Sequence, residues 1–168
     1  MQVFGLSLSA FTTLHVILSL IGIVAGIVVV LGLLADKRLP GWTALFLAST
    51  ILTSLTGFLF PFSQLLPSHV VGLLSLLVLA IAVLALYAFR LDGSWRPVYV
   101  IAAVLALYLN VFVGVVQAFQ KLALLQPLAP TQSEPPFLVA QLAVLVIFVV
   151  LAVLALRSFQ PAARDASP

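Results

Sequence analysis

Five long apolar stretches, separated by short polar turns, limit what this chain can fold into more than any other feature of its sequence. A helix rises about 1.5 Å per residue, so it needs roughly 20 apolar residues to cross a hydrocarbon core of about 30 Å. Five segments meet that length, at residues 10–34, 41–60, 68–89, 97–120 and 136–156. We therefore predict an all-α polytopic membrane protein, built as a five-transmembrane-helix bundle.

The composition supports the same class of protein. Of the 168 residues, 64% are hydrophobic and only 7% are charged, which is too little polar surface to cover a water-soluble domain. Residues 1–157 are expected to form a single transmembrane domain, and residues 158–168 a short disordered cytoplasmic tail. The lipid bilayer is then the first partner of the chain.

The basic residues indicate which way the helices run. When the connections are assigned alternately to the two sides of the membrane, six of the seven Lys and Arg residues fall on one side, and only Lys121 falls on the other. Because cytoplasmic loops are enriched in Lys and Arg, we predict an outside N-terminus and a cytoplasmic C-terminus. Trp42 and Trp95 each open a helix beside a basic turn, as expected of indoles at the headgroup level. The six basic residues are Lys37, Arg38, Arg90, Arg96, Arg157 and Arg164.

Several classes of function are excluded by what the sequence lacks. The chain has no cysteine, so it holds neither a disulfide nor a thiolate metal site. Its basic residues are scattered singly or in pairs, which argues against nucleic acid as a partner. It contains no zinc-protease, nucleophile-elbow, P-loop or dinucleotide motif, and Glu134 is the only acidic residue on the outer side. Because paired carboxylates for acid and base chemistry are missing, we predict a non-enzymatic protein without a cofactor.

Polar side chains within the predicted helices gather in the outer half of the membrane. Polar groups in hydrocarbon cost free energy unless they find partners, so these side chains should face one another or a water-filled recess. Two interpretations stay open: ordinary helix packing through interhelical hydrogen bonds, or a pocket for a small amphipathic ligand or a partner protein. Such a partner would be another membrane protein or a second copy in a homo-oligomer. The candidate pocket residues are His15, Ser19, Thr53, Thr56, His69, Asn110, Gln117, Lys121, Glu134 and Gln141.

Helical spacing places some of these residues on a common face. His15, Ser19, Gly22 and Gly26 follow one another at positions i, i+4, i+7 and i+11 of the first predicted helix. Gly22 and Gly26 also form a GxxxG pair, a pattern typical of closely packed membrane helices. The glycines should therefore permit a close approach between helix backbones.

The two histidines give an alternative function. His15 and His69 are the only histidines, both are placed on the outer side, and imidazole nitrogens are axial ligands of haem iron. A haem b-binding or quinone-linked membrane electron carrier that uses both residues is therefore an alternative to the ligand pocket. A passive channel or facilitator is a second alternative, although the apolar inner halves of the helices argue against a continuous polar path.

One polar stretch, LAPTQSEPPF at residues 128–137, interrupts the apolar sequence between the fourth and fifth predicted helices. Pro136 suits the first turn of the fifth helix, and Glu134 is favoured near the positive end of that helix. Four prolines from Pro127 to Pro136 stiffen a segment that is longer than a turn requires. We therefore predict a lid over the outer mouth of the pocket, with Glu134 near Lys121 or one of the histidines.

Several stretches resemble a group of small bacterial integral membrane proteins that have no assigned activity. These stretches are LTSLTGFLFPF, LPSHVVGLLSL, ALYLNVFVGVVQAFQ and LAPTQSEPPF, and the resemblance covers most of the chain. It implies a multi-pass protein of the bacterial inner (plasma) membrane. It carries no activity, cofactor or catalytic residue over to this sequence.

Overall fold

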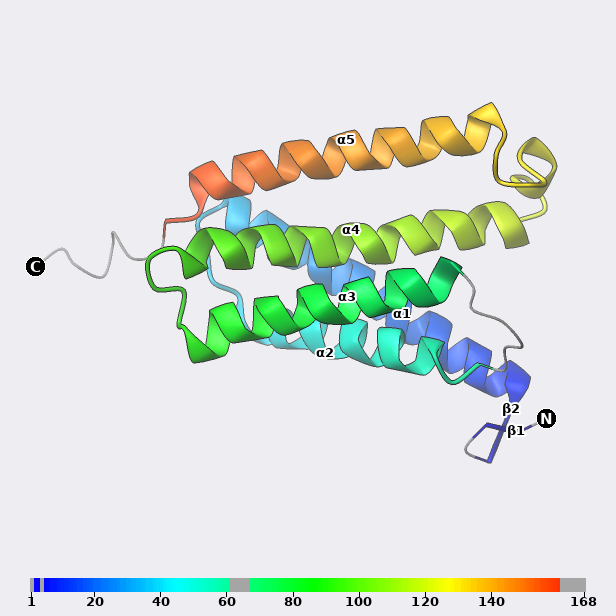
Figure 1. Cartoon of the computed structure of the whole chain (residues 1–168), viewed down its shortest axis with the longest axis horizontal. Helices are drawn as coiled ribbons and strands as arrows, with labels where there is room; N and C mark the ends of the chain where they lie inside the picture. Colours follow the sequence, from blue (N-terminus) through cyan, green and yellow to red (C-terminus); the bar gives the residue numbers. More distant parts are fainter. Residues whose placement is uncertain (1, 4, 61–66, 161–168) are drawn as a thin grey trace, which may run out of the picture.

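The long helices run alternately in opposite directions along one bundle, and α1 begins at the end opposite to the one where α5 finishes (Figure 1). This computed structural model describes residues 2–3, 5–60 and 67–160. The long helices are α1 (Leu8–Leu34), α2 (Pro40–Gly57), α3 (Pro67–Val83), α4 (Trp95–Lys121) and α5 (Pro135–Ser158). A π-helical turn, η1 (Leu84–Ala88), continues α3, and a 3-10 turn, η2 (Gln126–Leu128), lies between α4 and α5.

A short hairpin precedes α1. Two strands of two residues each, β1 (Gln2–Val3) and β2 (Leu6–Ser7), pair antiparallel with Gln2 opposite Ser7. Ser7 is also the N-cap of α1, because its hydroxyl accepts a hydrogen bond of 3.2 Å from the amide of Ala10. The cap explains why α1 begins two residues before the predicted segment.

Proline and turn residues set most of the other helix boundaries. Pro40 and Pro135 occupy the first helical positions of α2 and α5, where the missing N–H has no intrahelical partner in any case. When η1 is counted with α3, every boundary lies within three residues of its predicted place. The largest difference is at α2, which ends at Gly57 rather than at residue 60. Residues 161–168 of the predicted tail lie outside the described residues.

Four of the helices are long and apolar enough to cross a membrane. They are α1, α4, α5 and the combined helix of α3 and η1 from Ser68 to Ala88. The remaining long helix, α2, has 18 residues and a higher share of Thr and Ser, and it is not among the four. The fold is therefore an all-helical, multi-pass membrane protein, while the crossing by α2 and the orientation of the termini stay predictions.

The basic turns gather at one end of the bundle. Turns after α1 and η1, the first turn of α4 and the last turn of α5 all lie at the end where α1 finishes (Figure 1). We call this the basic end, and its described basic residues are Lys37, Arg38, Arg90, Arg96 and Arg157. Lys121 closes α4 at the opposite end, called the Lys121 end below. Arg164 lies outside the described residues.

Close packing of α1 against α2 and α4 forms the apolar core. Ala25 and Phe46 are fully buried, and Leu107 is 1% exposed. Gly26 makes this contact possible, since a Cβ atom there would lie 2.6 Å from Leu107 Cδ1 and 2.8 Å from Phe46 Cε2. The predicted role of the Gly22 and Gly26 pair in close helix packing is thereby confirmed for Gly26.

The helix α5 is much less buried than the other membrane helices. Within its most apolar window 11% of the residues are buried, compared with 50% for α4. Its contacts are with α4 and α1, and Figure 1 shows it along the outside of the bundle. Most of its apolar side chains are therefore left to face lipid.

Replacement of Gly26 by Ala is expected to destabilise the bundle by about 1–3 kcal/mol, because the added methyl group overpacks a buried site. The matched control is Gly41→Ala, since Gly41 lies in the first turn of α2 with nothing within 4 Å of its added Cβ. Reversible unfolding of both variants in mixed micelles measures the difference. Equal stability of the two variants would contradict the close contact at Gly26.

Candidate functional site

A cavity of about 730 Å³ lies among four helices at the Lys121 end of the bundle. Its walls come from the first half of α1, the last half of α2, the start of α3 and the last half of α4. The predicted pocket residues can therefore be compared with the lining of this cavity. Seven of the ten predicted residues line it: His15, Ser19, Thr53, His69, Asn110, Gln117 and Lys121.

The floor of the cavity is a polar contact between α1 and α4. Ser19 Oγ donates to Asn110 Oδ1 at 3.0 Å, and Asn110 Nδ2 donates to the carbonyl oxygen of Ser19 at 3.4 Å. Gly22 lets the side chains of Thr50 and Asn110 lie close to the α1 backbone, because a Cβ atom there would lie 3.0 Å from Asn110 Nδ2 and 2.9 Å from Thr50 Oγ1. One turn further along α1, the apolar contacts of Gly26 begin, so the polar lining stops there.

Thr50 has the least usual environment in the floor. Its side chain is 1% exposed and lines the cavity, yet its Oγ1 has no hydrogen-bond partner among the described residues. A buried hydroxyl without a partner costs about 1–3 kcal/mol in proteins. A group inside the cavity, from water or from a ligand, would remove that cost.

A histidine and a threonine join α1 to the end of α2. His15 Nδ1 lies 2.8 Å from Thr56 Oγ1, and Thr56 Oγ1 itself donates to the carbonyl oxygen of Leu52 at 2.7 Å. Because the threonine hydroxyl has only one hydrogen, it accepts from His15, so Nδ1 carries the proton. In a neutral ring Nε2 is then a hydrogen-bond acceptor.

Thr56 thus supports the cavity without lining it. It positions His15 through the hydrogen bond, and the His15 ring also packs perpendicular to the ring of Phe60, with ring centroids 5.2 Å apart. This arrangement leaves the imidazole on the wall with a fixed tautomer. Thr56 was predicted as a pocket residue and is better described as a residue that positions His15.

The second histidine lies on the opposite wall. His69 is 7% exposed, lines the cavity from the first turn of α3, and packs against the ring of Phe58 with centroids 5.7 Å apart. Both histidines therefore border one cavity, as the haem alternative requires, and that alternative stays a prediction. Across residues 2–3, 5–60 and 67–160, no three His, Asp or Glu side chains come together as a metal site.

Serine and threonine residues complete the lining, and several of them were missed by the sequence analysis. Ser54 Oγ donates to Ser75 Oγ at 3.2 Å and so links α2 to α3. The helical spacing of Thr50, Thr53 and Ser54 could have identified one wall, and the three-residue spacing of His69, Gly72 and Ser75 another. The missed polar residues of the lining are Thr12, Thr50, Ser54, Ser68 and Ser75.

Gln141 lies away from the cavity, which corrects its predicted place. It sits on α5, where its Nε2 donates to the carbonyl oxygen of Phe112 at 3.2 Å. Its Oε1 is buried and has no partner among the described residues. The residue therefore joins α5 to α4, as interhelical hydrogen bonds do in membrane bundles.

The predicted lid does not cover the cavity, and Glu134 does not line it. Ala129 is instead buried with Phe119 and Phe137, so the loop packs on the ends of α4 and α5. Glu134 Oε1 accepts from the amide and hydroxyl of Thr131, at 3.1 and 2.9 Å, and Oε2 accepts from the amide of Ser133 at 3.1 Å. These partners replace the predicted approach to Lys121 or a histidine.

These hydrogen bonds set the acidity of Glu134. Desolvation by the loop raises the pKa of the carboxyl, but the bonds from Thr131 and Ser133 favour the charged form and outweigh it. The pKa of Glu134 is therefore lowered from its usual value of 4.5. The Glu134 carboxylate therefore stabilises the loop through hydrogen bonds to Thr131 and Ser133.

Comparison with protein family models, with curated proteins and with solved structures gives no match to this chain. Functional conclusions therefore rest on the residues and geometry of the cavity.

The Ser19 and Asn110 pair can be tested by a double-mutant cycle. We expect Ser19→Ala and Asn110→Ala to be coupled by about 0.6–1.7 kcal/mol, the range for hydrogen bonds between membrane helices. The control cycle pairs Asn110→Ala with Thr12→Ala, because the Thr12 hydroxyl donates within its own helix to the carbonyl oxygen of Leu8. Unfolding in mixed micelles gives both couplings, and additivity in both cycles would rule out the proposed floor.

The loop should respond to acid through Glu134. Because the folded pKa lies below the unfolded value of 4.5, the carboxylate stabilises the loop fully above pH 4.5 and loses that effect as the pH falls through the folded pKa. Exchange protection of the Thr131 and Ser133 amides should decrease in that acidic range. Protection of the Leu125 amide, which donates to the carbonyl oxygen of Leu122, should not change, and Glu134→Ala should abolish the pH response.

Proposed function

We propose that this chain is a five-span protein of the bacterial inner membrane that binds a small amphipathic ligand in its large cavity. The ligand has an apolar body and carries a hydroxyl, carbonyl or carboxylate oxygen at one end. The observation that carries the proposal is the buried hydroxyl of Thr50 on the cavity floor, which has no hydrogen-bond partner among the described residues. We propose a binding role without catalysis.

The side-chain arrangement of α2 supports its crossing as the fifth span. Its polar side points inward, with Thr43, Ser49 and Thr50 each at most 6% exposed, whereas Leu45 and Leu52 are 44% and 47% exposed. Hydroxyls of the inward side also bond within the helix, as Ser49 Oγ does to the carbonyl oxygen of Leu45 at 2.6 Å. A low average hydropathy is therefore compatible with an apolar surface toward lipid.

The charge distribution supports the proposed orientation. All the described basic residues except Lys121 belong to the basic end, and the positive-inside bias assigns such an end to the cytoplasm. The large cavity then opens in the periplasmic half of the membrane. A ligand would enter from the periplasm or from the outer leaflet of the inner membrane.

The size and lining of the cavity favour a small molecule over a partner protein. Ligand sites are typically concave, about 300–1,000 Å³ in volume, and mostly apolar with a few placed polar groups. The cavity of about 730 Å³ fits that description. Its apolar walls include Leu20, Ile23 and Val113, and its polar groups converge on the floor at Asn110 and Thr50.

The charge of the lining limits the head group of the ligand. Among the described residues that line the cavity, Lys121 is the only one with a formal charge at neutral pH, and none is Asp or Glu. A neutral or anionic oxygen-bearing head group is therefore favoured over an ammonium group. Dodecanoate has such a head group and an apolar chain, so it is a suitable probe, and dodecyltrimethylammonium is its cationic counterpart.

Thr50→Val should weaken binding of dodecanoate by about 2–10-fold, since it removes one hydrogen-bonding group worth about 0.5–1.5 kcal/mol. The variant should fold with equal or greater stability, because the hydroxyl it removes has no partner among the described residues. The measurement is equilibrium dialysis of labelled dodecanoate against the protein in a fixed concentration of detergent, with empty micelles as the blank.

The matched control is Ser49→Ala at the neighbouring position. Ser49 is 4% exposed but does not line the cavity, and its hydroxyl is bonded within α2. We expect it to bind dodecanoate like the parent protein. Retention no greater than in empty micelles, or preference for the cationic counterpart, would reject the proposed ligand class.

A further inference from the structure

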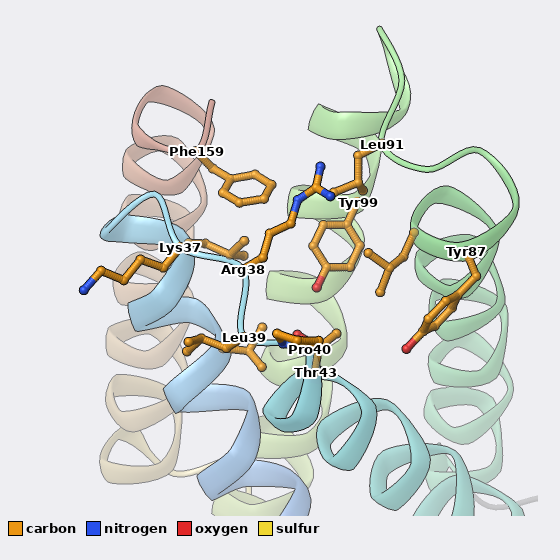
Figure 2. A pocket seen from close by; sticks show the side chains of 12 residues that line it. Lys37, Arg38, Leu39, Pro40, Thr43, Tyr87, Leu91, Tyr99 and Phe159 are labelled. Atoms are coloured by element: carbon orange, nitrogen blue, oxygen red, sulfur yellow. The ribbon is translucent and has the colours of Figure 1, made fainter. Parts of the chain in front are cut away.

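A second, smaller cavity lies at the basic end of the bundle (Figure 2). It has a volume of about 190 Å³ and is bordered by the turn from α1 to α2, by η1, by α4 and by the residue after α5. That volume is below the usual range of about 300 Å³ or more for drug-sized ligands. It suits a compact group such as a phosphate together with the first carbons attached to it.

Most residues that line this small cavity are apolar, and the charged ones, Lys37 and Arg38, are both cationic. Leu33, Leu91 and Phe159 are among the apolar residues, and Arg38 is the lining residue whose charged group lies beside them in Figure 2. Figure 2 shows the guanidinium group of Arg38 beside Leu91, Tyr99 and Phe159, over the cavity. The combination is that of a site for an amphipathic anion.

Arg38 has no counter-ion in the described part of the chain. No Asp or Glu lines the small cavity, and the nearest acidic residue along the sequence, Asp36, directs Oδ1 to the amide of Gln160 at 2.7 Å. Arginine is the side chain best suited to bind phosphate oxygens, because its planar fork donates two parallel hydrogen bonds. A cation placed at an apolar cavity without a carboxylate is therefore available to a bound anion.

The rest of the basic end adds to this attraction. Within the described residues this end holds five Lys and Arg side chains and two carboxylates, those of Asp36 and Asp92. Basic pockets between transmembrane helices are known to hold the head groups of anionic lipids. The cavity is lined by Tyr87 and by residues near the ends of α1, η1 and α5, a position that matches the depth of a lipid head group.

We propose that the small cavity binds a phosphate group, with Arg38 as its main ligand. The phosphate is carried by an anionic phospholipid or is free in solution, and these two sources share the chemistry that Arg38 recognises. The site is separate from the large cavity and does not depend on the function proposed for it.

The test measures which phospholipid stays with the purified protein. The protein is taken from detergent containing equal amounts of phosphatidylglycerol and phosphatidylcholine, and the retained lipid is counted by native mass spectrometry. We expect a preference for phosphatidylglycerol that Arg38→Gln lowers about tenfold or more, as for the loss of a hydrogen-bonded charge pair. Arg38→Lys should lower it less, because it keeps the charge and loses the fork.

Lys37→Gln is the matched control, since it removes one positive charge from the adjacent position. Figure 2 shows the Lys37 ammonium group directed away from the small cavity. An equal loss of preference in Lys37→Gln and Arg38→Gln would mean that diffuse surface charge attracts the lipid, and the proposed site would be rejected. Because Arg38 is exposed, its replacement should leave the fold intact, which unfolding in mixed micelles verifies.

A second arm identifies the source of the phosphate. Equilibrium dialysis of labelled inorganic phosphate, in detergent without phospholipid, tests the free anion on the same variants. Arg38-dependent retention of phosphatidylglycerol alone assigns the site to lipid, and Arg38-dependent retention of inorganic phosphate alone assigns it to the free anion. Retention of neither ligand would overturn the proposal.

Discussion

The close contact of α1 with α2 and α4 around Gly22 and Gly26 is the constraint on which the rest of the structure depends. At Gly26 the missing side chain admits Phe46 and Leu107, and the result is a dense apolar core. One turn away, Gly22 faces hydroxyl and amide groups, and the bundle is hollow beyond it. Because tightly packed side chains cannot move aside freely, this contact fixes where the packed half of the bundle ends.

Hydrocarbon gives polar groups few ways to be satisfied, and this bundle uses two of them. Some hydroxyls bond to carbonyl oxygens of their own helix, as Thr53 Oγ1 does to Ser49 at 2.8 Å, and others bond across helices, as Ser19 does to Asn110. Thr50 does neither among the described residues. Helix packing and a ligand pocket were two interpretations of one set of polar residues. In the structure some of these residues form hydrogen bonds between helices, as Gln141 does away from the cavity, and others line the cavity.

The sequence alone was sufficient for the helices and for seven of the twelve polar residues of the cavity lining, because both follow from helical periodicity and from hydrophobicity. His15, Ser19 and Asn110 were placed correctly since the spacing of a helix decides which residues share a face. Gln141 was misplaced because its environment depends on how α5 is rotated against α4, which no local pattern specifies. The predicted lid was wrong for a related reason, because Glu134 forms hydrogen bonds with residues at most three positions away. Such local bonds cost less conformational entropy than contacts across the bundle.

The same constraint separates the two cavities. Both are bordered by α1, α2 and α4, but the apolar contact at Gly26 lies between their linings, where Leu107 Cδ1 and the Phe46 ring already occupy the space of a side chain. Coupling between two sites requires an element with two discrete arrangements that both sites bias. A core packed this closely has no free space for a second arrangement, so occupancy of one cavity has no evident means of changing the other. The two cavities are thus separate spaces on either side of one packed apolar core.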